Sequence, residues 1–401
     1  MDLKSNEPFW LVKNGIIAAF PSLREDAQCD VLVVGGGITG ALIAHQCVRE
    51  GFDTILIDKR EIANGSSAAT TSMLQYEIDV PLYQLAQKIG QSGAEAAYKA
   101  CLDSIWRLEE ICKNIKSNAG FAERKSLYFA RFKKDVAPLQ EELAARAAAG
   151  FDVEWVAAAD LESRFHLHEA RGAILSAAGA SVDAYRLVHE LLLHDMRRSL
   201  RVYDRTELTN LDHRPGFNLA RLQTGATIRA RKTVFCCGYE ATHFIKENFV
   251  DLLSTFAIVS EVNPAIGSEF PDLLVWNTDD PYLYMRTTDD GRILVGGADE
   301  EFTSAAKRDA LISKKAKALH QSFHRHFPGA TFQSDFAWAG TFGETRDGLP
   351  YIGTHDDFPG SYFVLGFGGN GITFSVIGMA MVADWLRDKT HPLAWHFRFG
   401  R

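Results

Sequence analysis

A glycine-rich turn directly after a short apolar run is the feature that most constrains how this chain folds. Residues 31–34 read Val-Leu-Val-Val, and residues 35–40 read Gly-Gly-Gly-Ile-Thr-Gly. A continuous apolar run suits a strand that is buried on both faces of a parallel sheet. A helix is predicted over residues 38–50, with Gly51 in the position of a C-terminal cap, and a second buried strand over 54–58. This segment therefore predicts a βαβ unit.

Each glycine of the turn has a distinct role in a dinucleotide-binding βαβ unit. The first permits a tight turn, the second lets the backbone approach a pyrophosphate, and the third allows the helix to pack closely on the strand. The start of the helix would point its amides at the phosphates, and the acid that ends the second strand could accept hydrogen bonds from a ribose. The residues expected to contact the dinucleotide are Gly35, Gly37, Ile38, Thr39, Gly40, Asp58 and Lys59. The motif alone does not distinguish NAD from FAD, and a purely structural turn is the alternative.

Length, charge and cysteine content limit the remaining possibilities. The chain has 401 residues, which suggests two domains or one α/β domain with an insertion. A formal net charge of −8 with no basic run argues against a nucleic-acid partner. The six cysteines form no metal-binding or disulfide pattern, and no apolar stretch is long enough to cross a membrane, so we expect a cytoplasmic protein.

Five segments between residue 30 and about residue 390 make the chain resemble a known family. The first is the opening unit with the small-residue loop over 63–72, and the others are 179–187, 233–238, 338–353 and 366–373. Together they resemble the D-amino acid oxidase and glycine oxidase family of FAD-dependent oxidoreductases. The resemblance implies an α/β fold in which a discontinuous, Rossmann-like FAD-binding domain carries an inserted α+β substrate domain with an antiparallel sheet.

The resemblance also implies further FAD contacts. The small-residue loop would cross the pyrophosphate and ribityl chain, and the strand that ends at Gly238 would approach the adenosine. The helix that follows the last glycine-rich segment would direct its N-terminus at the flavin, where its dipole favours negative charge on the reduced ring. The implied contacts are Ser66, Ser67, Thr70, Thr71, Cys237, Gly238, Gly340, Gly368, Gly369, Asn370, Gly371, Ile372 and Thr373. This return of the C-terminal segment to the cofactor favours FAD over NAD.

FAD should be bound non-covalently, because the cysteine near Gly340 and the histidine after the small-residue loop that some relatives use for attachment are both missing. The neighbouring Cys236 and Cys237 are interpreted as buried thiols rather than as a redox disulfide. The histidine pairs 166/168 and 320/324 have no third ligand nearby in the sequence, so no metal site is predicted.

The boundaries expected for the two domains follow the same resemblance. The FAD-binding domain would comprise residues 1–80, 176–245 and 333–401, and the substrate domain 81–175 and 246–332. Residues 1–29 read as an irregular arm. Helices are predicted over 81–118, 135–149, 304–326 and the end of 361–386, and strands over 126–131, 152–156, 232–236, 255–262, 282–287, 292–295 and the start of 361–386.

The substrate pocket departs from the relatives. Amino-acid oxidases of this family clamp the substrate carboxylate with arginines, at positions where this chain has Phe342 and Gly369. The missing arginines therefore favour an amine, an N-alkyl compound or a hydroxyl compound over an α-amino acid as the substrate. On the strand over 282–287, Tyr282, Tyr284 and Arg286 share one face by alternation, so they are pocket candidates together with Gln75, although Arg286 could equally be structural.

The predicted function is transfer of a hydride from a C–H bond of a small amine, N-alkyl amino compound or amino acid to flavin N5. No catalytic residue is identified. The alternatives are a dehydrogenase of a hydroxy compound and a protein that binds FAD in a structural, non-redox role. The electron acceptor, whether oxygen, a quinone or another carrier, stays open.

Overall fold

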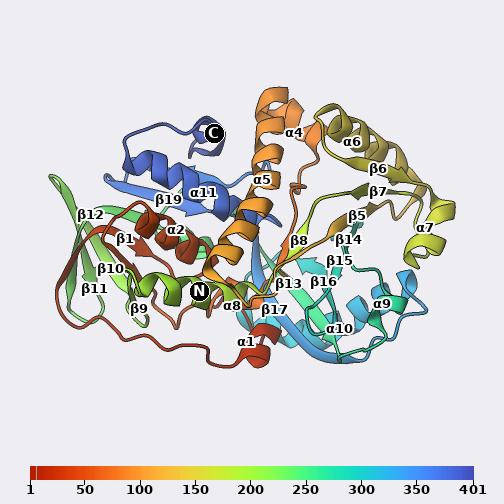
Figure 1. Cartoon of the computed structure of the whole chain (residues 1–401), viewed down its shortest axis with the longest axis horizontal. Helices are drawn as coiled ribbons and strands as arrows, with labels where there is room; N and C mark the ends of the chain where they lie inside the picture. The colour runs from red at the N-terminus through yellow and green to blue at the C-terminus, as the bar shows by residue number, and fades with distance from the viewer. Residues whose placement is uncertain (6) are drawn as a thin grey trace.

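Two large sheets lie side by side and organise the chain (Figure 1). The computed structural model describes residues 1–5 and 7–401. Within this part of the chain each of the two sheets has eight strands, and a small third sheet joins β3 (Met73–Leu74), β8 (Ala180–Ser181) and β4 (Ala122–Glu123). The α/β fold class is confirmed, with one largely parallel and one largely antiparallel sheet.

The first sheet contains the βαβ unit. Its central strand β1 (Ala27–Val34) pairs in parallel with β2 (Thr54–Ile57) on one side and with β12 (Thr227–Phe235) on the other. β2 consists of four buried residues, as expected for a strand that is covered on both faces. The other strands are β9 (Arg201–Tyr203), β10 (Leu208–Arg214), β11 (Phe217–Leu222), β18 (Tyr351–Gly353) and β19 (Ser361–Leu365).

A layer of helices covers this sheet. The helix of the βαβ unit, α2 (Ile38–Arg49), packs against α8 (Ala184–Met196) and α11 (Gly371–Leu386). The long helix α5 (Gln91–Ile115) packs on α11 and stands between the two sheets in Figure 1. No described helix is long and apolar enough to cross a membrane.

The second sheet has the strand order β17-β13-β16-β15-β14-β5-β7-β6 and is antiparallel except for the pair β14 and β5. One of its faces packs against α10 (Ala305–His326). Its strands are β17 (Ser334–Glu344), β13 (Asp251–Ser260), β16 (Ile293–Glu300), β15 (Tyr284–Thr287), β14 (Leu273–Asn277), β5 (Lys125–Phe129), β7 (Ala173–Ser176) and β6 (Val153–Val156). The remaining elements are α1 (Phe9–Asn14), α3 (Ser66–Ala69), α4 (Leu82–Ile89), η1 (Lys133–Asp135), α6 (Val136–Ala148), α7 (Ala158–Phe165), η2 (Gly238–His243), α9 (Ile266–Glu269) and α12 (Ala394–Phe397).

Several predicted elements need correction. The arm over 1–29 is not wholly irregular, because α1 forms between Pro8 and Gly15 and β1 begins at Ala27. The helix predicted over 81–118 is divided at Gly90, whose φ of +84° ends α4 and precedes α5. The strand expected over 282–287 begins only at Tyr284. The domain boundaries remain predictions. The chain is expected to return to the FAD-binding domain at residue 333, yet β17, which begins at Ser334, pairs with β13 of the second sheet.

Candidate functional site

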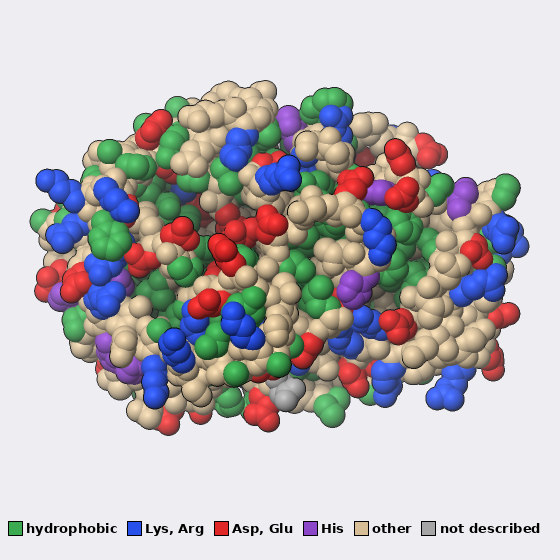
Figure 2. Space-filling model, turned by 180° about the vertical axis from the view of Figure 1, so that it is seen from behind, with side chains coloured by type: hydrophobic (Ala, Val, Ile, Leu, Met, Phe, Trp, Pro, Cys, Tyr) green, Lys and Arg blue, Asp and Glu red, His purple; other side chains and the backbone are tan. Residues whose placement is uncertain are grey.

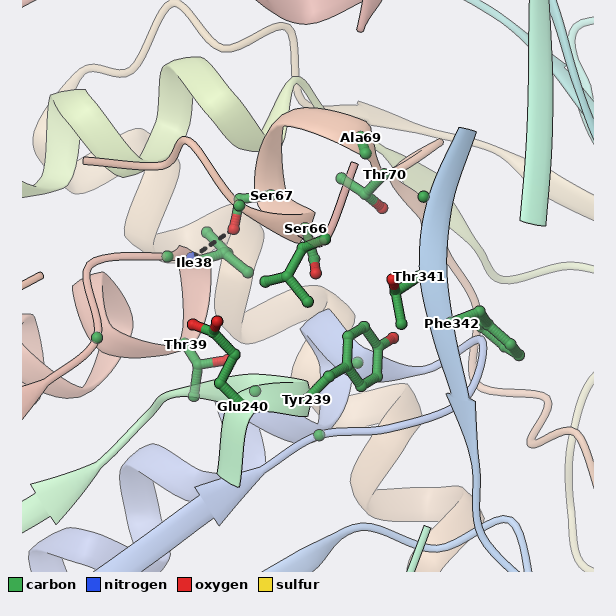
Figure 3. Close-up of a pocket in the computed structure, with 18 of the residues that line it drawn as sticks. Ile38, Thr39, Ser66, Ser67, Ala69, Thr70, Tyr239, Glu240, Thr341 and Phe342 are labelled. Atoms are coloured by element: carbon green, nitrogen blue, oxygen red, sulfur yellow. Dashed lines mark hydrogen bonds between the residues drawn. The ribbon is translucent and has the colours of Figure 1, made fainter. Parts of the chain in front are cut away.

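A cavity of about 680 Å³ runs between the two sheets. This volume lies within the range of cofactor and ligand sites. The cavity extends from the glycine turn and the end of β2, past the small-residue segment, to the second sheet and the start of α11. Figure 3 shows part of its wall, with Ser67 facing the start of α2 and Tyr239 facing the strand that carries Thr341.

The glycine turn closes tightly at one end of this cavity. Gly35 has φ +113°, and a Cβ there would lie 2.4 Å from the carbonyl oxygen of Cys236. A Cβ on Gly40 would lie 1.8 Å from the carbonyl oxygen of Gly35, so only glycine fits at this point of helix–strand contact. At the start of α2 the amide of Ile38 donates to the hydroxyl of Ser67 at 2.9 Å (Figure 3). The N-terminus of α2 is therefore directed at the cavity, where it favours an anion.

Asp58 stands at the end of β2 with both carboxylate oxygens on backbone amides. Oδ2 accepts from Gly36 at 2.6 Å and Oδ1 from Arg60 at 2.8 Å. Burial raises the pKa of Asp58, while these two hydrogen bonds oppose the rise. A carboxylate has about four lone-pair positions, so acceptor capacity remains for sugar hydroxyls.

The basic groups at this end of the cavity are already paired. Lys59 and Arg60 each approach Oε1 of Glu240 at 2.8 Å. Burial opposes ionisation of Glu240, but the hydrogen bonds from Arg60 and Lys59 bring its pKa down to about 2. The single carboxylate of Glu240, on η2, is thus shared by both basic side chains.

The segment predicted as a small-residue loop contains one helical turn, α3, and two buried tryptophans hold it in place. The indole nitrogen of Trp10 donates to the carbonyl of Thr70 at 2.6 Å, and that of Trp338 donates to the carbonyl of Ala69 at 2.8 Å. Ser66, Ser67, Thr70 and Thr71 border the cavity. The hydroxyls and amides of this segment therefore face the space between the sheets from a braced position.

The glycine-rich segment before α11 reaches the cavity from the other side. Asn370 precedes the helix and donates its side-chain amide to the carbonyl of Gln75 at 2.9 Å. The amide of Gly368 donates to the carbonyl of Gly343 at 2.8 Å, which ties the segment to β17. The N-terminus of a sixteen-residue helix is thus placed at the junction of the two sheets.

The second sheet supplies an aromatic wall. Trp276 from β14 and Tyr284 from β15 border the cavity together with Tyr282. The rings of Tyr282 and Tyr284 lie 5.4 Å apart. From β17, Thr341 and Phe342 leave the strand on opposite sides (Figure 3).

Most of the predicted contact residues border one continuous cavity. Gly40 and Thr373 do not, since Gly40 packs on Gly35 and the hydroxyl of Thr373 donates to the carbonyl of Asn370. Those that do are Gly35, Gly37, Ile38, Thr39, Asp58, Lys59, Ser66, Ser67, Thr70, Thr71, Gln75, Cys237, Gly238, Tyr282, Tyr284, Gly340, Gly368, Gly369, Asn370, Gly371 and Ile372.

Arg286 is the pocket candidate that the structure corrects. It does not border the cavity, and its guanidinium donates to the carbonyls of Thr71, Thr287 and Val182 at 2.8, 2.9 and 3.3 Å. Burial lowers its pKa to about 10. Alternation along the strand placed Arg286 on the side of Tyr284, but the guanidinium is enclosed beneath the small-residue segment and is not free to bind a substrate.

Sequence reasoning missed two carboxylates of the wall, Glu77 and Asp79. They follow Gln75 at alternate positions, so residues 75, 77 and 79 all border the cavity. This alternation in the sequence could have identified both carboxylates as residues of the cavity wall. Tyr239, Trp276 and Thr341 were also missed, and their positions carry no local motif.

The residues present fit an elongated dinucleotide such as FAD. The Gly37 backbone is open enough that an added Cβ would meet only the Ser67 hydroxyl, at 3.0 Å, so a pyrophosphate could approach it closely.

Cys236 and Cys237 are free, and burial raises the pKa of Cys237 to about 12, so its thiol stays protonated. The described residues include no cluster of three or more side chains suited to a metal ion.

Comparison with known proteins agrees with this geometry. The family model described as DAO, FAD dependent oxidoreductase, matches residues 30–385. Glycine oxidase of Geobacillus kaustophilus is 22% identical over 90% of this chain and 93% of its own, and its crystal structure superposes with a TM-score of 0.79 over 94% of this chain and 99% of that chain, at 19% identity.

Two further relatives cover most of the chain at similar identity. A putative Rieske 2Fe-2S iron-sulfur protein of Bacillus subtilis is 22% identical over 96% of this chain and 74% of its own length. Gamma-glutamylputrescine oxidoreductase of Escherichia coli is 22% identical over 92% of this chain and 86% of its own.

Proposed function

Because the chain belongs to the DAO family of FAD-dependent oxidoreductases, we propose that it holds FAD non-covalently along the cavity and oxidises a small amine, an N-alkyl amino compound or an amino acid. The observation that carries the proposal is the continuity of the cavity. It joins a dinucleotide-type βαβ turn to an aromatic wall on a second sheet, so a bound dinucleotide can present its reactive end to a substrate.

Each part of the cavity has a distinct task in this proposal. FAD, when bound, supplies the acceptor for a hydride and its two electrons. The amides at the start of α2 hold the pyrophosphate, and Asp58 accepts hydrogen bonds from a ribose. The N-terminus of α11 stabilises negative charge where the two sheets meet.

The second sheet would orient the substrate. Trp276, Tyr282 and Tyr284 form an apolar surface with polar edges, which restricts the substrate and excludes water from the reacting carbon. The nearby relatives named for glycine and for gamma-glutamylputrescine act, by those names, on amino compounds, and this supports the same class here.

Anaerobic mixing tests the proposal. The FAD-loaded protein is mixed with amines, N-alkyl amino compounds, amino acids and hydroxy acids, and loss of the oxidised flavin spectrum is followed. We expect amino compounds to bleach the flavin. Bleaching by hydroxy acids alone would make the protein a hydroxy-compound dehydrogenase, and an unreduced flavin across all classes would favour the structural role.

The electron acceptor and the cellular compartment are two further parts of the proposal. Mixing the reduced enzyme with oxygen and, separately, with a quinone would identify the electron acceptor. The described cysteines are all free, which supports a reducing compartment such as the cytoplasm.

A further inference from the structure

One carboxylate is fixed on the substrate side of the cavity, against the segment that leads into α11. Oδ2 of Asp79 accepts from the amide of Gly369 at 2.8 Å. A Cβ on Gly369 would lie 2.8 Å from Oδ1, and a Cβ on Gly368 would lie 2.4 Å from Oδ2. Any side chain at either position would therefore displace the carboxylate, which rests directly on this backbone and borders the cavity.

This carboxylate has no cation of its own. Among the described residues that border the cavity the basic side chains are Lys59, Arg60 and His243, and the first two are paired with Glu240. No ion pair involving Asp79 is found in the described part of the chain. Desolvation in the cavity raises the pKa of Asp79, and the Gly369 amide opposes that rise. The side chain itself is exposed to the cavity, so a bound cation can reach the carboxylate and would favour its ionised form.

A second carboxylate of the wall adds to the negative potential. Glu77 is 4% exposed, and its Oε1 accepts from the hydroxyl of Ser176 at 2.8 Å and lies 3.4 Å from a guanidinium nitrogen of Arg146. Its Oε2 has no hydrogen-bond partner among the described residues. Arg146 is shared with Glu142 at 2.6 Å, so one arginine faces two acids. On the face shown in Figure 2, acidic side chains also gather around a hollow near the middle.

One aromatic side chain, that of Tyr282, lies beside Asp79, and others border the same cavity. A Cβ on Gly369 would lie 2.8 Å from Oδ1 of Asp79 and 3.7 Å from the hydroxyl of Tyr282. The carboxylate and the phenol therefore converge on one point. Trp276, Tyr284 and Tyr239 border the cavity with Tyr282. The faces of such rings attract cations, and tryptophan and tyrosine do so most strongly.

We propose that the substrate binds as a cation, a protonated amine whose ammonium pairs with Asp79 between these aromatic side chains, and that the same carboxylate makes the site reject substrates with an anionic group there. The proposal rests on the proposed function, since it names the substrate class of the same site. It rests on placement and charge, and Asp79 is a specificity residue in it. The competing explanation is that Asp79 merely caps the turn before α11.

Three planar probes of the same shape separate charge from turnover. Benzamidinium is cationic, benzamide neutral and benzoate anionic, and none has an oxidisable C–H bond next to nitrogen. Their dissociation constants are measured on the FAD-loaded protein by calorimetry and by the shift of the flavin absorption bands. We expect benzamidinium to bind about tenfold or more tightly than benzamide, and benzoate to bind more weakly than both. Equal affinities, or preference for benzoate, would overturn the proposal.

The variant Asp79→Asn keeps an oxygen acceptor for the Gly369 amide and removes the charge. We expect the benzamidinium affinity to fall about tenfold while the benzamide affinity changes less than about twofold. Asp103→Asn, on an exposed position of α5, is the matched control and should leave all three constants unchanged. A turn cap without a role in recognition would leave the benzamidinium constant of Asp79→Asn unchanged.

The outcomes also separate this inference from the proposed function. If the protein prefers benzamidinium but no amine bleaches the flavin, the cation site is supported and the proposed oxidation of amines is contradicted. If amino acids bleach the flavin and the protein prefers benzoate, the proposed oxidation is supported and the cation site is contradicted. If Asp79→Asn does not fold, the ranking of the three probes on the native protein still decides.

Discussion

At the scale of single residues, the guanidinium of Arg286 satisfies three backbone carbonyls and lies 5.5 Å from the ring of Trp10. One of these carbonyls belongs to Thr71, which borders the cavity. Arg286 thus supports backbone that borders the cavity, while its own guanidinium does not border the cavity. The strand pattern predicted its side correctly, but whether a side chain ends in a cavity depends on what other segments cover it.

We expect Arg286→Ala to lower the free energy of unfolding by about 2–4 kcal/mol, because three backbone carbonyls lose their donor. FAD content should fall together with stability. Chemical denaturation and the flavin absorbance per protein measure the two effects, with the exposed Arg325→Ala as control. Unchanged stability combined with weaker substrate binding would restore Arg286 to the pocket.

The carboxylates near the substrate side also predict a pH effect. Partial burial and the nearby charges of Asp79, Asp299 and Asp280 raise the pKa of Glu344 to about 7. Burial likewise raises the pKa of Asp299 to about 6. A carboxyl whose folded-state pKa is raised stabilises the fold most below its unfolded value, and this contribution is lost as the pH rises through the folded value.

The melting temperature should therefore decline from about pH 5 to about pH 8, and Glu344→Gln should reduce that decline. At about pH 8 the variant should melt about 1–2 °C above the native protein, and at about pH 5 the two should agree. Thermal unfolding of the FAD-loaded protein at both values checks this. The exposed Glu141→Gln should follow the native curve, and a Glu344→Gln curve that does the same would contradict the assignment.

At the scale of elements, the βαβ unit could be read from the sequence because its signals are local. Glycines, a buried apolar run and a helix period all lie within about thirty residues. The small-residue segment could be located but its helical turn α3 could not, because two tryptophans from distant segments brace it. Helix α1 was also missed, since it has six residues and lies between Pro8 and Gly15.

We expect Trp10→Phe to keep the packing of α1 and to lose the hydrogen bond to the Thr70 carbonyl. Stability should fall by about 1 kcal/mol, and the dissociation constant of FAD should rise about fivefold because the segment over 66–71 is less well fixed. Fluorescence titration of the apoprotein with FAD measures the constant. Trp395→Phe, at a position 66% exposed, serves as the control, and an unchanged constant for Trp10→Phe would show that α1 does not brace the cofactor segment.

At the scale of the whole molecule, the fold class and the FAD-dependent family are both confirmed, and each could be predicted from motifs that repeat a known arrangement. The cavity could be predicted only in part. Asp79 contacts the segment before α11 from 290 residues away in the sequence. Glu77 and Trp276 border the same cavity, and Trp276 reaches it from the second sheet. No local pattern records such long-range contacts. The acidic side chains of the cavity come from segments far apart in the sequence, so the sequence alone did not predict that they share one cavity.

Release of the flavin from the purified protein shows whether this cavity holds FAD without a covalent bond. The purified protein is denatured with acid, and the flavin released into the supernatant is compared with the protein by absorbance and chromatography. We predict a yellow protein with a two-banded visible spectrum that releases FAD in an equimolar amount. A colourless protein that takes up no added FAD would contradict the claim, and flavin that stays with the precipitate would contradict non-covalent binding.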